Sequence, residues 1–358
     1  MTRTPDLEPS QAWWIPGPHL QTAWARLARS RKLLTFGCRE IMTTPDGDEL
    51  VLDHTAGPPG SPRVLILHGL EGSSHSWHTQ ALALLVRRSG WRATALNFRS
   101  CARSADGTGP RLPNRRPRLY HSGDTGDLEL VVRTLAAREP DVPLYALGFS
   151  LGGNVLLKWL GEVGESGAPN PIRAAATISV PYDLAAASHY LERPVGRLYA
   201  AHFMKRLKPK ALAVMARFPI ETSHLDAGRI QAARTFQEFD ACVTAPLHGF
   251  ASPNDYYRRS SSLGYLARIR VPTLCISSED DPFYPSAAIE PARRAASGAV
   301  DFEVTSWGGH TGFIAGIWPW RPIYWAEDEV IRWLSRWQQT LAHGLMNGGG
   351  PISPIRDS

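Results

Sequence analysis

The chain has 358 residues, of which 43% are hydrophobic and 20% are charged, and its 39 basic and 33 acidic side chains leave a net charge of +6. This composition is ordinary for a globular protein, and the chain is long enough to bury a sizeable core. The 4 cysteines lie far apart and form no C-x-x-C pair. That pattern argues against a zinc site and a disulfide framework, and it favours a reducing compartment.

The sequence offers no segment for crossing a membrane. Residues 1–9 lack the apolar stretch of a signal peptide, and no run approaches the ~20 apolar residues that a transmembrane helix needs. The basic run 111–118 is interrupted by prolines and contains no aromatic residue, so we expect a solvated loop there and no nucleic-acid site. We therefore expect a cytoplasmic protein whose partner is a small molecule.

Residues 63–179 alternate short apolar runs with longer helical patterns. Starting with a strand and alternating strand with helix, the expected elements are 63–67, 79–88, 91–98, 127–138, 143–147, 151–160 and 173–179. Such alternation predicts the α/β class, with a mostly parallel sheet covered by helices on both faces. The strands read as continuous apolar runs because both of their faces are buried.

The alternation stops after Pro181 and returns later. Residues 183–262 hold helical patterns and no convincing strand. Further strands are expected at 270–277 and 300–305, with a helix from about Ser286 and a last one over 325–343. The middle segment therefore reads as a mainly helical insertion that caps the ends of the strands.

These boundaries divide the chain into four parts. The core is expected to comprise residues 46–182 and 263–343, and residues 183–262 form the cap. Residues 1–45 contain Trp13, Trp14 and several prolines, and we expect them to wrap the surface. Residues 344–358 are rich in Gly and Pro, which predicts a disordered tail.

A G-x-S-x-G pentapeptide, Gly148-Phe-Ser150-Leu-Gly152, carries the first chemical signal. Alone it is weak, but it directly follows an expected strand and opens an expected helix, which is the setting of a nucleophile elbow. Small residues suit the strained and closely packed turn, and the helix N-terminus favours developing negative charge. The sequence therefore predicts Ser150 as the nucleophile of a serine hydrolase.

His310 is the expected base, because a serine hydroxyl is a poor nucleophile until its proton is removed. It lies in a glycine-rich loop directly after the strand 300–305, and it follows the nucleophile in the chain, as the elbow mechanism requires. His75 and His78 are three residues apart, which is compatible with a metal site. No carboxylate or cysteine completes a ligand set with them, so we expect neither a metal nor a cofactor.

The acid that orients the base should follow the penultimate strand, where Glu279, Asp280 and Asp281 offer three carboxylates. Its task is to hold the imidazole in one tautomer and to stabilise the imidazolium. Asp281 is preferred, because it directly precedes the turn at Pro282 and can point back toward the His310 loop. Asp280 is the alternative, and Glu279 is the third choice.

An oxyanion hole is the remaining requirement. Leu151, the residue after the nucleophile, supplies one backbone N–H, and the loop after the strand 63–67 supplies the other. That loop reads His68-Gly-Leu70-Glu-Gly72, so the N–H of Leu70 is the expected second donor. The side chain of His68 is expected to orient the loop and not to move protons.

Several motifs together point to one family. They are Pro18-His-Leu-Gln-Thr22, His68-Gly-Leu-Glu-Gly72, Gly148-Phe-Ser-Leu-Gly-Gly-Asn154, Asp280-Asp-Pro-Phe283 and Gly308-Gly-His310. From about Trp13 to Trp337 the chain resembles the YheT-like branch of the α/β-hydrolase superfamily, which is related to ABHD-type, embryogenesis-associated lipases and to yeast medium-chain ester synthase/esterases. The resemblance implies the α/β-hydrolase fold, and its triad falls on Ser150, Asp281 and His310.

One departure from the family pattern is visible. The family tends to have Asn-x-Arg-Gly after the fourth strand, where this chain has Asn97-Phe-Arg99-Ser100. The departure concerns the backbone of that loop and leaves the triad untouched. The family also implies hydrolysis of carboxylic esters without a cofactor, and its yeast members pass acyl groups to alcohols as well.

We therefore predict a carboxylic ester hydrolase acting on short- to medium-chain acyl esters or lipids. The alternatives are an alcohol O-acyltransferase with the same triad and a non-catalytic binding protein on the same fold, which an intact triad disfavours. Five cap residues are expected to form either an acyl pocket or the cap's own core: Tyr190, Tyr199, Phe203, Met204 and Met215.

The basic stretch 205–210 in the cap raises peripheral docking on anionic membranes as a weaker hypothesis. We expect Pro209 to break that helix. An ordinary solvated face is therefore the favoured interpretation of this stretch.

Overall fold

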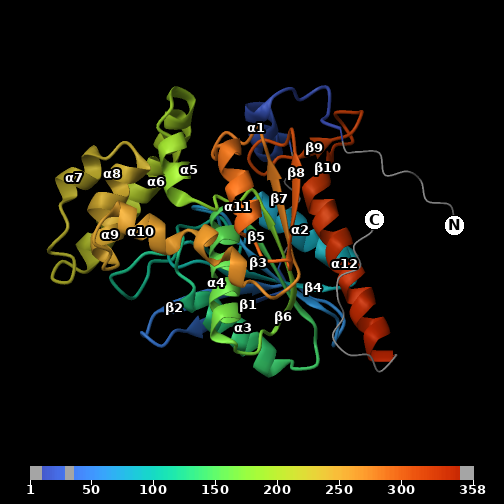
Figure 1. Ribbon diagram of the computed structural model, residues 1–358. Coiled ribbons are helices and arrows are strands. Elements are labelled where there is room, and N and C mark those ends of the chain that lie inside the picture. The colour runs from blue at the N-terminus through green and yellow to red at the C-terminus, as the bar shows by residue number, and fades with distance from the viewer. Residues whose placement is uncertain (1–9, 29–35, 347–358) are drawn as a thin grey trace.

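An eight-stranded sheet forms the centre of the computed structural model, which describes residues 10–28 and 36–346 (Figure 1). The strand order is β1-β2-β4-β3-β5-β6-β7-β8. β2 pairs antiparallel with both β1 and β4, and all other neighbours are parallel. The strands are β1 (Cys38–Thr43), β2 (Glu49–His54), β3 (Arg63–Leu67), β4 (Arg92–Asn97), β5 (Leu144–Phe149), β6 (Ile172–Ile178), β7 (Thr273–Ser278) and β8 (Val300–Thr305).

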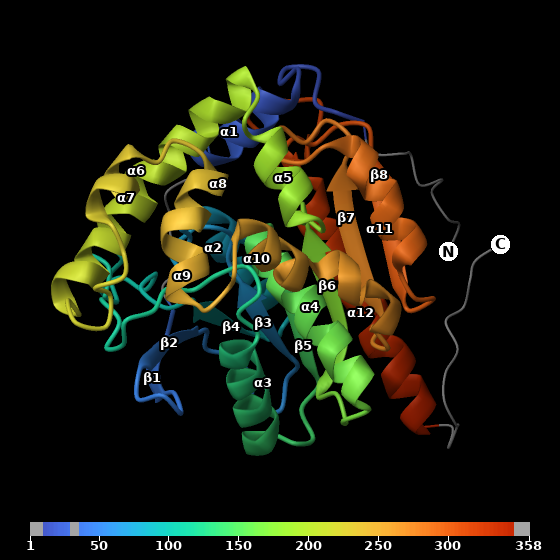
Figure 2. The same ribbon diagram turned by 60° about the vertical axis from the view of Figure 1, so that its left-hand side comes forward.

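Helices cover both faces of this sheet (Figures 1 and 2). α3 (Gly126–Arg138), α4 (Leu151–Ser166) and α11 (Ile289–Ala295) pack on one face, and α2 (Trp77–Arg88) and α12 (Trp325–Met346) pack on the other. Strand β3 shows the alternation, because Leu65 and Leu67 join the first core while Val64 and Ile66 join the second. All four side chains are fully buried, as expected for a strand covered on both faces. The predicted α/β-hydrolase architecture is confirmed.

Strands β1 and β2 lie outside the sequence prediction. β1 forms one edge of the sheet, and Met42 is its only buried side chain, so the strand carries no apolar run. β2 follows after a short turn, and no helix separates the two strands. The strand–helix rhythm that reveals the parallel strands is therefore absent here. Because β1 lies within the segment 1–45, that segment contributes a strand to the sheet.

Between β6 and β7 the chain, all of it described, forms helices joined by turns and contains no strand (Figure 2). The elements are α5 (Leu184–Tyr190), α6 (Pro194–Arg217), α7 (Ala227–Ala232), α8 (Phe236–Phe239), η1 (Asp240–Thr244), α9 (Ala245–Leu247), α10 (Pro253–Ser260) and η2 (Ser262–Arg268). Side chains from α6, α7, α8 and η1 share an apolar cluster of their own. The division into a core and a cap with the boundaries given above stays a prediction.

Helix α6 runs without interruption through Pro209. The expected break at Pro209 is therefore wrong. A proline inside a helix costs about 3 kcal/mol, because it removes one backbone hydrogen bond and crowds the preceding turn. Leu207, Ala211 and Val214 flank Pro209 and are buried in the cap's apolar cluster, and this burial offsets the cost.

The N-terminal part and a small hairpin pack against the sheet together. α1 (Pro18–Ala28) follows a segment in which Ala12 and Ile15 are buried against Ile314. Ile314 belongs to β9 (Ile314–Ala315), which pairs with β10 (Ile323–Tyr324). Of the expected tail 344–358, residues 344–346 complete α12, and the remainder lies outside the described residues, as do 1–9 and 29–35. No helix in the described part of the chain is long and apolar enough to span a bilayer.

The basic run 111–118 is largely neutralised within the chain. Arg111 approaches the buried carboxylate of Glu71 at 2.8 Å, and Arg118 pairs with Asp124 at 2.8 Å. Arg115 remains 59% exposed. The expectation of a solvated loop therefore describes Arg115 but not Arg111, whose side chain is only 19% exposed.

Arg99 ties the loop after β4 to two other parts of the core. Its guanidinium donates two hydrogen bonds to Asp127, at 2.8 and 2.7 Å, and one to Asp48 at 2.9 Å, and only 2% of the side chain is exposed. Burial alone would lower the pKa of Arg99, but the carboxylates of Asp127 and Asp46 raise it above its ordinary value. The next residue, Ser100, has a φ of 55°, a conformation that glycine adopts more readily. This explains the family's preference for glycine at that position.

Replacing Arg99 by methionine should lower the free energy of unfolding by about 3–5 kcal/mol, because two carboxylates would be left buried without their cation. Urea denaturation followed by circular dichroism measures this. The matched control is Arg138→Met, because Arg138 also makes a two-pronged pair, with Glu40, but is 52% exposed and should cost at most ~1 kcal/mol. Equal losses in the two variants would contradict the assignment of Arg99 as a buried anchor.

Candidate active site

Ser150 lies at the turn between β5 and α4. Its φ of 50° and ψ of −118° are unusual for a residue with a side chain, and such a conformation costs of order 1–3 kcal/mol. The backbone N–H of Ser150 donates to the carbonyl of Ile178 at the end of β6, at 2.9 Å. The turn is therefore held by the neighbouring strand, and the hydroxyl is presented at the carboxyl edge of the sheet.

Two glycines allow this turn to form. A Cβ at Gly148 would lie 2.6 Å from the carbonyl group of Gly152, and a Cβ at Gly152 would lie 2.5 Å from the carbonyl oxygen of His68. Real Cβ atoms do not approach other atoms so closely, so only glycine fits at either position. The G-x-S-x-G pattern thus reflects the packing of α4 against the ends of β5 and β3.

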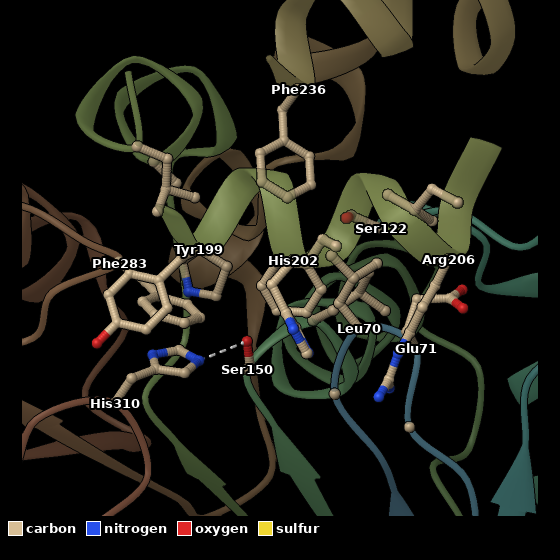
Figure 3. A pocket seen from close by; sticks show the side chains of 18 of the residues that line it. Leu70, Glu71, Ser122, Ser150, Tyr199, His202, Arg206, Phe236, Phe283 and His310 are labelled. Carbon is tan, nitrogen blue, oxygen red and sulfur yellow. Dashed lines mark hydrogen bonds between the residues drawn. The ribbon is translucent and has the colours of Figure 1, made fainter. Parts of the chain in front are cut away.

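His310 lies next to Ser150, in the loop after β8 (Figure 3). Its Nε2 is 3.0 Å from the Oγ of Ser150, and its Nδ1 is 2.8 Å from Oδ2 of Asp281. A carboxylate can only accept, so Nδ1 carries the proton and Nε2 is free to accept from the serine hydroxyl. The ring of Phe283 stacks on the imidazole with centroids 4.1 Å apart, which fixes the plane of His310.

The three candidate acids have different partners. Asp281 is buried and contacts His310 with both carboxylate oxygens, at 2.8 and 3.1 Å. Asp280 instead accepts the backbone N–H of Gly309 at 2.8 Å, and Glu279 is exposed. Of the three carboxylates, Asp281 is the one that contacts the imidazole of His310, and Asp280 bonds the loop that carries His310.

The loop 68–72 runs beside Ser150. A Cβ at Gly69 would lie 3.4 Å from the Cβ of Ser150, and Leu70 and Leu151 both line the cavity that contains the serine hydroxyl. The side chain of His68 accepts from the N–H of Phe98 at 3.2 Å, so its Nδ1 donates to the carbonyl of Gly69 at 2.7 Å. Burial lowers the pKa of His68 to about 4. The imidazole is therefore neutral near pH 7 and holds the loop.

Glu71 anchors the same loop from the other side. Its N–H donates to the hydroxyl of Tyr120 at 2.7 Å, and its carboxylate accepts from Lys210 at 2.6 Å and pairs with Arg111 at 2.8 Å. Burial would raise the pKa of Glu71, but the charges of Lys210 and Arg111 hold it below its usual value. Since Lys210 belongs to α6, a helix of the insertion fixes the loop that carries Leu70.

Two residues of α1 were not singled out by the sequence analysis. Thr22 accepts the backbone N–H of His310 on its Oγ1 at 2.9 Å. Gln21 is fully buried, accepts from the N–H of Ile314 at 2.7 Å and donates to its carbonyl at 3.1 Å. The motif Pro18–Thr22 contains both residues. Nothing in its composition indicates that they contact the loop of His310, almost 300 residues later in the chain.

The cavity at Ser150 has a volume of about 1080 Å³, at the upper end of the usual range for small-molecule sites. Its walls come from the insertion as well as the sheet, and they are mostly apolar. The apolar lining includes Leu184, Leu191, Leu198, Tyr199, Phe203, Phe236 and Val243. Of the five cap residues considered from sequence, Tyr199 and Phe203 line the cavity, and Phe203 also packs with Met204 and Met215 in the apolar cluster of the cap. Tyr190 is in neither group, and its ring lies against the guanidinium of Arg193, 4.2 Å from the centroid.

The lining of the cavity also contains polar side chains. His121 and His248 are among them, with ring centroids 4.7 Å apart, and burial lowers the pKa of both well below the usual value for histidine. Asp240 is nearby in the lining and accepts from Tyr257 at 2.7 Å, and burial raises its pKa to about 6. The two imidazoles are therefore neutral near pH 7 and can bond uncharged polar groups, whereas the carboxyl of Asp240 is mostly ionised at that pH.

Comparison with known proteins identifies the family. Residues 62–316 match the family described as the alpha/beta hydrolase fold. The chain belongs to this family. This hydrolase is 34% identical to the candidate esterase YheT of Escherichia coli (strain K12), over 88% of this chain and 90% of that protein. It is 31% identical to the phospholipase ABHD3 of Bos taurus, over 90% of this chain and 76% of that protein.

A solved structure supports the same fold. The alpha/beta hydrolase GrgF from Penicillium sp. sh18 superposes with a TM-score of 0.53 over 85% of this chain and 99% of that one. The two sequences are 13% identical. At that identity the likeness concerns the fold alone.

Replacing Thr22 by valine should lower the turnover of p-nitrophenyl acetate about tenfold, because the N–H of His310 would lose its acceptor and the imidazole would shift. Steady-state kinetics measures kcat and KM separately, and the loss should fall on kcat. The matched control is Thr340→Val in α12. Thr340 also bonds the carbonyl four residues before it, as Thr22 does with Pro18. A kcat unchanged from the wild type would show that α1 does not position His310.

Replacing Lys210 by methionine should also lower kcat about tenfold, because the loop that carries Leu70 would lose one of the two cations at Glu71. Lys210→Arg should restore most of the activity, since arginine keeps the charge. Lys208→Met is the matched control, because Lys208 lies on the same helix and bonds the carbonyl of Gln231 and not Glu71. If Lys210→Met and Lys208→Met behave alike, Glu71 does not depend on Lys210.

Proposed function

We propose that this hydrolase cleaves carboxylic esters, with Ser150 as nucleophile, His310 as general base and acid, and Asp281 as the orienting carboxylate. The proposal rests chiefly on one arrangement: a serine hydroxyl 3.0 Å from an imidazole that is 2.8 Å from a buried carboxylate, beside a large apolar cavity. Relatives named as an esterase and a phospholipase support the same class of substrate.

The first half of the reaction forms an acyl-enzyme. His310 Nε2 takes the proton of Ser150 as Oγ attacks the ester carbonyl, and the carbonyl electron pair moves to oxygen. When the tetrahedral intermediate collapses, His310 gives that proton to the departing alcohol. Asp281 accepts from Nδ1 throughout and stabilises the positive imidazolium between the two transfers.

The second half repeats these steps with water. His310 removes a proton from water as the water oxygen attacks the acyl carbonyl, and it returns the proton to Ser150 Oγ as the acid leaves. The N–H groups of Leu70 and Leu151 are the proposed oxyanion donors in both halves. The placement of Gly69 against Ser150 supports this, because it brings the loop with Leu70 beside the side chain of the proposed nucleophile.

The acyl chain is proposed to lie along the apolar wall made by the insertion. Leu191, Leu198 and Phe203 line that wall. The side chains of His121 and His248 would face the alcohol portion, where neutral hydrogen-bonding groups suit an uncharged hydroxyl-bearing part. Short- to medium-chain acyl esters and lipids are the substrate class that this shape favours.

The central experiment measures hydrolysis of p-nitrophenyl esters from acetate to long chains by the wild type and Ser150→Ala. The variant should lose roughly 10³-fold or more in kcat, because the nucleophile is gone. Labelling of Ser150 by a fluorophosphonate, located by mass spectrometry, tests the same assignment without a chosen ester. Wild-type turnover by Ser150→Ala, or labelling at another residue, would sink the proposal.

A pair of variants distinguishes the two aspartates. Asp281→Asn should lower kcat by about 10⁴-fold, because an amide at this position stabilises the wrong tautomer of His310. Asp280→Asn makes the same change, one carboxylate oxygen to an NH2 group, in the neighbouring side chain. Its effect should be much smaller, because Asp280 bonds the backbone N–H of Gly309 and not the imidazole of His310. A larger loss in Asp280→Asn would reverse the assignment of the acid.

The acyl acceptor is tested in the same assay by adding ethanol. Hydrolysis predicts that free acid remains the main product. Ethyl ester as the main product at low ethanol concentration would instead identify an acyltransferase that uses the same three residues.

A further inference from the structure

Five large apolar side chains are exposed around the β9–β10 hairpin, which we call the tryptophan patch. Their exposed fractions are 73% for Trp13, 69% for Ile317, 51% for Trp318, 73% for Trp320 and 48% for Ile323. Single exposed apolar residues are common on soluble proteins, but a group of this kind marks an interaction surface.

The tryptophan patch is a preformed surface. The indole N–H of Trp13 donates to the carbonyl of Ile317 at 2.9 Å, and that of Trp14 donates to Gly316 at 3.0 Å. The rings of Trp318 and Trp320 stack with centroids 5.1 Å apart and planes 19° apart. These contacts join the N-terminal segment to the hairpin, so little conformational freedom remains to be lost on binding.

The two described stretches of chain that form the tryptophan patch carry no carboxylate side chain. Residues 10–24 and 314–324 contain no aspartate or glutamate, and they include Arg321, which is exposed. The whole chain carries a net charge of +6. An indole has an apolar body and a polar N–H edge, and tryptophan is enriched where protein meets the headgroup layer of a bilayer. The absence of carboxylates from residues 10–24 and 314–324 also limits repulsion from anionic lipid.

The tryptophan patch is structurally continuous with the wall of the cavity. Gln21 of α1 binds both backbone groups of Ile314 in β9, and His19, Thr22 and Ala23 of α1 line the cavity that holds Ser150. Figure 1 shows α1, β9 and β10 together at one end of the molecule. A surface bound to the hairpin would therefore lie next to the α1 side of the cavity.

We propose that the tryptophan patch docks this hydrolase on the surface of a lipid bilayer that contains anionic lipid. The indoles of Trp13, Trp318 and Trp320 enter the headgroup layer, and Arg321 faces lipid phosphates. The ester then reaches Ser150 from the bilayer along the α1 side. This last step rests on the proposed function, whereas the docking itself does not. The docking surface lies on the hairpin and not on the basic stretch 205–210.

The test measures co-flotation of the full chain with vesicles of equal parts phosphatidylcholine and phosphatidylglycerol. The wild type should float with the vesicles, and Trp318→Ala/Trp320→Ala should bind about tenfold more weakly or worse, because two indoles no longer leave water. The control is Ile220→Ala, which removes an apolar side chain that is 84% exposed and lies outside the patch. It should bind as the wild type does, and vesicles of phosphatidylcholine alone should bind the wild type more weakly.

Turnover of soluble p-nitrophenyl acetate by the double variant should equal that of the wild type, which shows that the fold is intact. Failure of the wild type to float, or equal flotation of the double variant, overturns the proposal. A second copy of the chain is the alternative partner for the patch, and sedimentation velocity tests it. If the wild type is a dimer and the double variant is a monomer, the patch is a contact between two copies and the proposal is overturned. If the wild type floats but hydrolyses no ester, docking stands and the proposed function fails.

Discussion

The site depends on the close packing that forces Ser150 into its unusual backbone conformation. The chain must leave β5, turn and start α4 while α4 lies against the end of β3, and no Cβ fits at Gly148 or Gly152. Ser150 is the residue left at the point of the turn, with a φ of 50°. The strain is offset by the buried sheet on either side, so the hydroxyl is fixed before any substrate arrives.

The other groups are brought to Ser150 by contacts from distant parts of the chain. His310 is oriented by Asp281 after β7, by the ring of Phe283 and by Thr22 in α1. The loop with Leu70 is held by His68 within it and by Lys210 from α6. Each of these supports is a hydrogen bond or a stacked ring on a buried group, so small displacements leave polar atoms unpaired.

The sequence could predict the elements that follow a general physical rule. Strands buried on both faces read as apolar runs, and residues that directly follow parallel strands must meet at one edge of the sheet, which is why Ser150, Asp281 and His310 could be picked out together. Their catalytic roles remain a proposal. The edge strand β1 has a single buried side chain, and the partners of Gln21, Thr22 and Lys210 lie far away in the chain, so no local pattern could reveal them. Pro209 is the opposite case, in which tertiary burial overrides a local rule.

The bond between Lys210 and Glu71 limits how independently the sequences of the helical insertion and of the loop after β3 can change. In many enzymes an inserted segment can be exchanged between relatives to alter substrate preference, as though it were a separate module. Here a chimera with a foreign insertion lacking a lysine at this place would leave the Glu71 carboxylate, 1% exposed, with Arg111 as its remaining cation. Transplanting an insertion would therefore require Glu71 to be replaced as well. Among relatives, a substitution at position 71 should accompany a substitution at position 210.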